Sequence, residues 1–160
     1  MLGSSNNFFI QQERYLTNKR VEVYSYLLNK GFTIPQINVY LKAYDYFCRN
    51  PKDFDGATAV KDLVDIEGYT GSDGLDLKAM LHDYYYVMYN VGANLICKIK
   101  ADKVFGKGIV RMGGLKRQEN LRVVGLILTS ILIIPYAVYK RGFMTKQQKQ
   151  LFNTDYNIFK

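Results

Sequence analysis

Apolar residues recur at helical spacing along most of the chain, and no stretch alternates for long enough to suggest a strand. The pattern predicts an amphipathic helix over residues 8–30, ended by Gly31, and a second helix over 35–49 that Pro35 opens. A short helix is expected at 58–64. The apolar stripe of the second helix is expected to lie in the core; its members are Val39, Tyr40, Ala43, Tyr44 and Phe47. The fold class predicted for the whole chain is all-α.

A pair of helices is predicted in the middle of the chain. The first starts near Leu75, and the second follows a tight connection at Gly92-Ala93-Asn94, which would lay the two helices antiparallel. Gly106 and Gly108 fall inside the second helix, where each glycine costs about 1 kcal/mol relative to alanine. We therefore divide the chain into an N-terminal helical region (1–68), a loop and helix pair (69–118), an apolar helix (119–142) and a polar tail (143–160).

The apolar helix is centred on residues 123–139, which form seventeen residues without a charge. As one helix these residues would be about 26 Å long, just short of the hydrocarbon core of a bilayer. Basic residues flank both ends of this segment. Pro135 is expected to kink the helix near its end. Two interpretations stay open: a transmembrane or deeply inserted helix, or a helix buried by protein. The polar and aromatic tail, residues 144–160, is expected to pack against a partner or to extend into solvent.

Composition narrows the class of protein. The chain has 160 residues, a formal net charge of +8, 14 tyrosines, 9 phenylalanines and two cysteines, Cys48 and Cys97. Two cysteines do not make the disulfide framework of a small secreted protein, although one bridge between them stays open. From Lys98 to Arg122 eight basic residues stand against two acidic ones. No nucleic-acid motif accompanies this basic segment, so we do not expect a nucleic-acid partner. Because an apolar segment follows it, the expected contacts are lipid headgroups or a protein partner.

Candidate chemistry is concentrated in the helix pair. His82 is the only histidine, and Tyr86 lies four residues later on the same helical face. The antiparallel connection would bring Asp102 of the second helix within hydrogen-bond distance of both side chains. Asp83 points about 100° away from His82, toward the preceding loop. The sequence has no zinc-ligand cluster, phosphate-binding glycine loop or Gly-x-Ser-x-Gly motif.

The glycine-containing loop, the His82-Asp83-x-x-Tyr86 motif and the Ala101-Asp102-x-x-Phe105 motif together resemble phospholipase A2 domains. The resemblance is closest to the disulfide-free domains of viral capsid proteins and phage-type sequences, and it covers roughly residues 69–113. It implies that His82 is the general base that activates a water, that Asp102 orients it and that Tyr86 braces the pair. It also implies a calcium ion, bound by Asp83 and by the backbone carbonyls of a loop that includes Tyr69, Gly71 and Gly74.

Two functions are therefore expected from the sequence. One is a calcium-dependent phospholipase A2-like acyl hydrolase that acts on a phospholipid membrane and is associated with a virion. The other is a non-catalytic, membrane-associated subunit of a larger assembly, in a virion or at an organellar membrane, that keeps a degenerate form of this helix pair. A base near neutral pKa and a Lewis acid for the oxyanion are what water attack on an ester requires.

Overall fold

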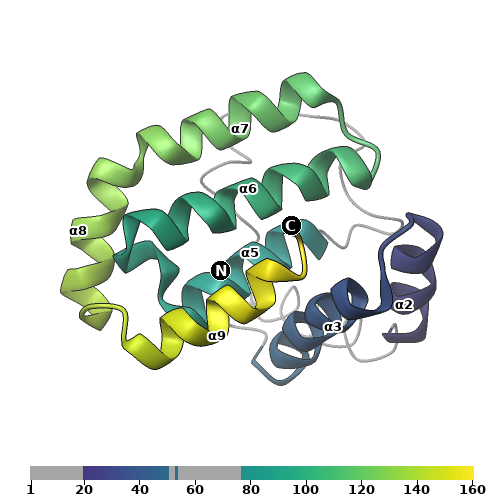
Figure 1. Ribbon diagram of the computed structural model, residues 1–160, viewed down its shortest axis with the longest axis horizontal. Helices are drawn as coiled ribbons and strands as arrows, with labels where there is room; N and C mark the ends of the chain where they lie inside the picture. Colours follow the sequence, from purple (N-terminus) through teal and green to yellow (C-terminus); the bar gives the residue numbers. More distant parts are fainter. Residues whose placement is uncertain (1–19, 51–52, 54–76) are drawn as a thin grey trace, which may run out of the picture.

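The computed structural model describes residues 20–50, 53 and 77–160 (Figure 1). Within these ranges the chain forms helices and no strand: α2 (Arg20–Asn29), α3 (Ile34–Arg49), α5 (Leu77–Tyr89), the 3-10 helix η2 (Val91–Ala93), α6 (Leu95–Arg111), α7 (Lys116–Leu128), α8 (Ser130–Arg141) and α9 (Lys146–Asn157). The predicted all-α class is confirmed for this part of the chain. The short helix expected at 58–64, the start of the helix expected at 8–30, and the loop with Tyr69, Gly71 and Gly74 lie outside the described residues.

Local signals in the sequence explain the boundary between α2 and α3. Gly31 follows α2 with a φ of 77°, a left-handed conformation that a side chain would disfavour. Thr33 then caps α3: the backbone N–H of Gln36 donates to its Oγ1, and its own N–H donates to Gln36 Oε1 at 3.1 Å. Pro35 lies in the first turn of α3, as predicted, and the helix begins one residue earlier, at Ile34.

The core combines aliphatic side chains with aromatic rings from α3, α5, α6 and α9. The apolar stripe predicted on α3 is buried, which confirms that prediction. Tyr40, Tyr44 and Phe47 from α3 and Tyr85 from α5 are among the largest side chains fully removed from solvent. Each such ring buries a large apolar area, so a few tyrosines and phenylalanines make a large contribution to the core beside its aliphatic side chains.

The C-terminal segment is the helix α9 and is docked on the core, so the prediction of a solvent-exposed or partner-bound tail is wrong. Phe152 is fully buried and meets the ring of Tyr85 edge to face, with centroids 5.1 Å apart. Asp155 accepts hydrogen bonds from the Tyr89 hydroxyl at 2.9 Å and from Lys42 Nζ at 2.9 Å. These contacts join α9 to α5 and α3. The sequence did carry a signal for this helix, because Thr145 and Gln148 form a capping box at its start.

The central pair, α5 and α6, runs antiparallel as the tight connection predicted. Lys78 near the start of α5 lies beside Gly108 near the end of α6, and His82 lies beside Asp102. Asn90 adopts a left-handed conformation between α5 and η2, with a φ of 51°, and Asn94 caps α6 by accepting from the Cys97 N–H at 3.1 Å. Both cysteines are free thiols, so the bridge that the sequence left open is not formed.

Close packing of α6 against its neighbours accounts for the two glycines inside it. A Cβ placed at Gly106 would overlap Val123 of α7 and lie 2.9 Å from Cγ of Glu119. A Cβ at Gly108 would lie 3.1 Å from both Lys78 Cβ and the Tyr40 hydroxyl. The low helix propensity of glycine is thus offset by the close approach that it allows. Figure 1 shows α6 and α7 side by side as a result.

The apolar stretch 123–139 is not one helix, so that prediction is wrong. α7 ends at Leu128, α8 begins at Ser130, and the two axes differ by 56°. The carbonyl of Leu126 accepts hydrogen bonds from Thr129 Oγ1 at 2.9 Å and from Ser130 Oγ at 3.3 Å, and such hydroxyl bonds to the preceding turn bend helices. The kink was expected at Pro135, but that residue lies inside α8 and the break between the two helices is at Thr129.

A membrane span therefore finds limited support in the described helices. None of them alone is both long and apolar enough to cross a bilayer, and only α7 and α8 taken together reach the required length and composition.

Candidate functional site

The site is built first on one face of α5. His82 and Tyr86 are one turn apart there, and their ring centroids lie 4.6 Å from each other. The imidazole also packs against Phe105 of α6, at 5.1 Å between centroids. His82 is 8% exposed. Two aromatic rings therefore contact the buried imidazole and restrict its orientation.

Asp102 of α6 completes the constellation that the sequence predicted. His82 Nε2 lies 2.9 Å from Asp102 Oδ1, and the Tyr86 hydroxyl donates to the same oxygen at 3.4 Å. Asp102 is fully buried. Because the carboxylate accepts, Nε2 carries the proton, and in the neutral imidazole Nδ1 is left as the acceptor. The expected proximity of the three side chains is confirmed.

Lys98 is the member of this cluster that the sequence analysis missed. It lies one turn before Asp102 on α6 and is fully buried, and its Nζ donates to Asp102 Oδ2 at 2.7 Å. The same Nζ donates to the carbonyl of Leu126 at 2.5 Å, at the end of α7. The i, i+4 spacing of Lys98 and Asp102 was a signal for a pair, but a lysine at that spacing ordinarily faces solvent.

The two carboxylates around His82 determine its protonation. Burial of the imidazole lowers its pKa, but the hydrogen bonds to Asp102 and Asp83 and their negative charges outweigh burial and raise the pKa of His82 to about 9. Burial, and after it the charge of Asp102, also raises the pKa of Tyr86 well above its ordinary value, so this hydroxyl remains a neutral donor. With a pKa of about 9, His82 is an imidazolium at neutral pH in the calcium-free protein.

Asp83 is the one predicted calcium ligand among the described residues. Its Oδ1 lies 3.7 Å from His82 Nδ1, on the opposite side of the ring from Asp102. The other predicted ligands, carbonyls of the loop with Tyr69, Gly71 and Gly74, lie outside the described residues. One carboxylate with several carbonyl oxygens is a donor set that calcium prefers, so the chemistry of Asp83 fits the ion. Within residues 20–50, 53 and 77–160, no three His, Cys, Asp or Glu side chains cluster closely enough to hold a metal by themselves.

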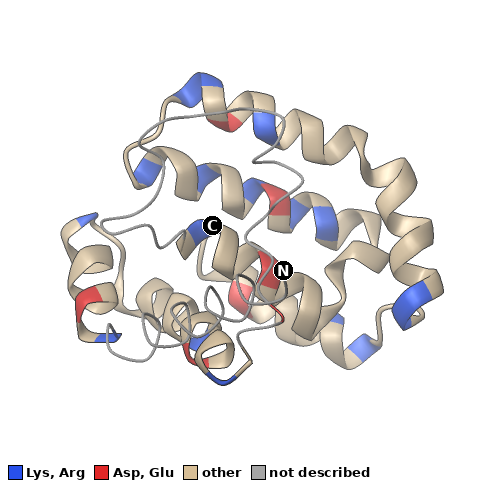
Figure 2. Cartoon of the chain, turned by 180° about the vertical axis from the view of Figure 1, so that it is seen from behind, with Lys and Arg blue, Asp and Glu red and all other residues tan. Residues whose placement is uncertain are grey.

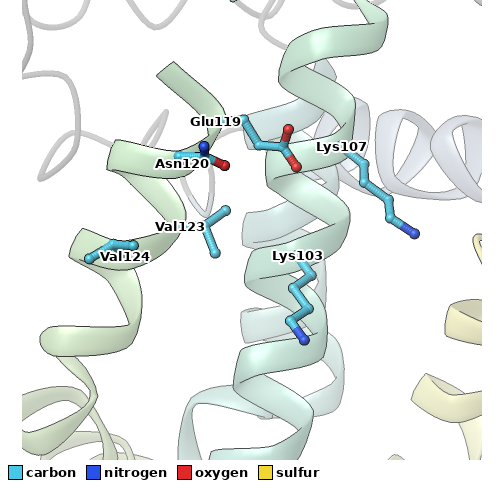
Figure 3. Close-up of a pocket in the computed structure, with 6 residues that line it drawn as sticks. All are labelled: Lys103, Lys107, Glu119, Asn120, Val123 and Val124. Atoms are coloured by element: carbon cyan, nitrogen blue, oxygen red, sulfur yellow. The ribbon is translucent and has the colours of Figure 1, made fainter. Parts of the chain in front are cut away.

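A separate cavity lies between α6 and α7 (Figure 3). It has a volume of about 300 Å³ and is lined by Lys103, Lys107, Glu119, Asn120, Val123 and Val124. None of His82, Tyr86 or Asp102 lines it, so this cavity is distinct from the buried cluster.

Comparison of the chain with protein-family models, with curated proteins and with solved structures gives no significant match. The likeness to phospholipase A2 therefore depends on the motif residues alone.

Proposed function

We propose that this chain is a calcium-dependent acyl hydrolase of phospholipase A2 type that acts on phospholipid at a membrane. The observation that carries the proposal is the hydrogen bond of 2.9 Å between His82 Nε2 and Asp102 Oδ1, made across an antiparallel helix pair. The Tyr86 hydroxyl on the same carboxylate oxygen adds support, because it occupies the position that the family motif assigns to it. The spacing of the His82-Asp83-x-x-Tyr86 and Ala101-Asp102-x-x-Phe105 motifs predicts both contacts.

In the proposed reaction, His82 Nδ1 takes a proton from a water molecule as that water attacks the carbonyl carbon of an ester. Asp102 holds the ring in the tautomer that presents Nδ1 and stabilises the imidazolium that forms. His82 then returns the proton to the alkoxide that leaves when the ester C–O bond breaks, giving a fatty acid and a lysophospholipid. Lys98 and Tyr86 keep the Asp102 carboxylate in place through its two oxygens.

A calcium ion, when bound by Asp83 and loop carbonyls, would supply positive charge for the oxyanion and offset the Asp83 charge that raises the pKa of His82.

Fatty acid release from phospholipid vesicles, with calcium and with a chelator, tests the proposal. We expect release by the unaltered chain with calcium, and loss of release with the chelator and in His82→Gln. Met88→Gln, on the same helix, is the matched control, because that side chain is exposed. Release that is the same in His82→Gln as in the unaltered chain, or no release from either, rejects the catalytic role.

The burial of His82 favours a second candidate function. An imidazole that is 8% exposed offers a substrate little access, which fits a non-catalytic, membrane-associated subunit of a larger assembly that keeps a degenerate form of the site. In that case the His82–Asp102–Lys98 cluster is a structural support for the core. The vesicle assay separates the two functions, because the subunit would bind membrane and release no fatty acid.

A further inference from the structure

A continuous apolar surface covers the outer side of α7 and α8. Its side chains recur at helical spacing along both helices and face away from the rest of the fold. Ile131 is 81% exposed and Tyr139 is 86% exposed. We call this surface the outer stripe; its members are Leu121, Val124, Leu128, Ile131, Leu132, Tyr136 and Tyr139. So many adjacent exposed apolar side chains are unusual on a water-facing surface and mark an interaction site.

The opposite side of the same two helices is packed against the protein. Arg122, Leu126 and Ser130 are buried there, and Lys98 Nζ bonds to the Leu126 carbonyl. Arg141 Nη1 donates to the Tyr86 carbonyl at 2.8 Å, which fixes the end of α8 to α5. The helices thus have one protein-facing side and one open side. A pair with one apolar side open and the other side held by protein suits helices that lie flat in a membrane interface.

Positive charge frames the outer stripe. From Lys103 to Arg141 the sequence has a single acidic residue, Glu119, against eight basic ones. Arg122 is buried on the protein-facing side. The other seven basic residues are Lys103, Lys107, Arg111, Lys116, Arg117, Lys140 and Arg141. Figure 2 shows Lys and Arg along α6 and at the two ends of the α7–α8 pair, with an uncharged stretch between those ends. Lys116 pairs with Glu119, so the acidic residue is already matched. An apolar surface with a basic border complements the charge of an anionic lipid bilayer.

The cavity between α6 and α7 adjoins this surface. Val124 belongs both to the outer stripe and to the lining of the cavity. Lys103 and Lys107 of α6 also line the cavity, together with Glu119, which pairs with Lys116 (Figure 3). An apolar wall beside two ammonium groups suits a phospholipid, whose acyl chain meets the valines while its phosphate meets the lysines.

We propose that α7 and α8 bind in the interface of an anionic phospholipid bilayer, with the outer stripe among the acyl chains. Lys103, Lys107, Arg117 and Lys140 face the headgroups. This surface would bring the proposed lipid hydrolase to its substrate, and in that purpose the inference rests on the proposed function. Binding itself needs no catalysis, so it is measured separately.

The test is co-sedimentation with vesicles, one set of phosphatidylcholine alone and one of equal parts phosphatidylcholine and phosphatidylglycerol, in the presence of a chelator. We expect binding to the anionic vesicles, weak binding to the neutral ones, and a decline with added salt. The double variant Ile131→Glu, Leu132→Glu should bind anionic vesicles about a hundredfold more weakly, because two buried apolar contacts are replaced by charges that the membrane repels. Both side chains are exposed, so the fold should remain intact.

The matched control is Val21→Glu, Leu28→Glu on α2, which changes two exposed apolar residues far from α8 (Figure 1). This control should bind as the unaltered chain does. Equal binding by the stripe variant, or equal binding to neutral vesicles, overturns the proposal. A dimer that forms without lipid and is dissociated by the stripe variant assigns the surface to a second copy, which also overturns it.

Failure of docking and failure of catalysis give different results. The stripe variant should still hydrolyse a short-chain phospholipid dissolved as monomers, since no surface is needed there. Vesicle binding without any hydrolysis would reject the proposed hydrolase and leave the docking surface standing.

Discussion

Removal of the Lys98 ammonium, as in Lys98→Met, should destabilise the protein strongly. Lys98 and Asp102 are both fully buried, and Lys98 Nζ is 2.7 Å from Asp102 Oδ2 and 2.5 Å from the Leu126 carbonyl. Breaking a buried ion pair from one side typically costs about 3–5 kcal/mol, because the remaining charge is left in a poorly solvating interior. His82 still faces Asp102 in the variant, so we expect the lower end, about 3 kcal/mol. Domains of this size have roughly 5–15 kcal/mol of stability in total.

The assay is urea denaturation of the unaltered chain, Lys98→Met, Asp102→Asn and the double variant. Removing both charges leaves neither one unmatched, so the double variant should be more stable than the sum of the single losses predicts, by about 2 kcal/mol. Lys107→Met, on the exposed side of α6, is the control and should change the free energy of unfolding by less than about 0.5 kcal/mol. A loss below about 1 kcal/mol in Lys98→Met, or strict additivity in the double variant, would refute this reasoning.

Three further outcomes follow from the packing and the charges. Gly106→Ala should lower the free energy of unfolding by about 1 kcal/mol or more, since the added Cβ would overlap α7. The Cβ added by Gly125→Ala meets nothing within 4 Å, so this variant should raise the free energy of unfolding by up to about 1 kcal/mol. Thermal denaturation of the two variants checks this contrast. Phe152→Ala should cost about 3–5 kcal/mol in chemical denaturation because the ring is fully buried, whereas Phe143→Ala, at an exposed ring, should cost little. In the calcium-free protein the pKa of His82 is raised from 6.5 to about 9. Its contribution to the free energy of unfolding should therefore be complete below pH 6.5 and be lost as the pH rises through about 9. Measured by denaturation at several pH values, the decline in the free energy of unfolding should be smaller in His82→Gln.

Short-range periodicity was sufficient to predict the helix pair and the proximity of His82, Tyr86 and Asp102. The spacing of His82 and Tyr86 places them on one face, and a tight connection dictates an antiparallel partner, so Asp102 could be placed from the sequence. The stripe of α3 was equally predictable, because its apolar residues recur with the helical period.

The features that the sequence did not reveal depend on tertiary contacts. Lys98 was counted with the surface charges, since only the approach of α7 shows that it is buried. The break at Thr129 results from hydroxyl bonds to the Leu126 carbonyl, which compete with helix continuation without any glycine or proline to mark them. The docking of α9 requires the Tyr85 and Tyr89 rings of α5 as a receiving surface, and no local pattern identifies such a surface.

The central claim is that the His82–Asp102 pair performs chemistry on a lipid ester. The most direct measurement is the initial rate of fatty acid release from anionic vesicles in the presence of calcium, compared between the unaltered chain and His82→Gln at equal amounts of vesicle-bound protein. We predict a rate that falls by about 10²–10⁴-fold in the variant, as expected for loss of a general base. Equal rates, or no release by the unaltered chain, would contradict it.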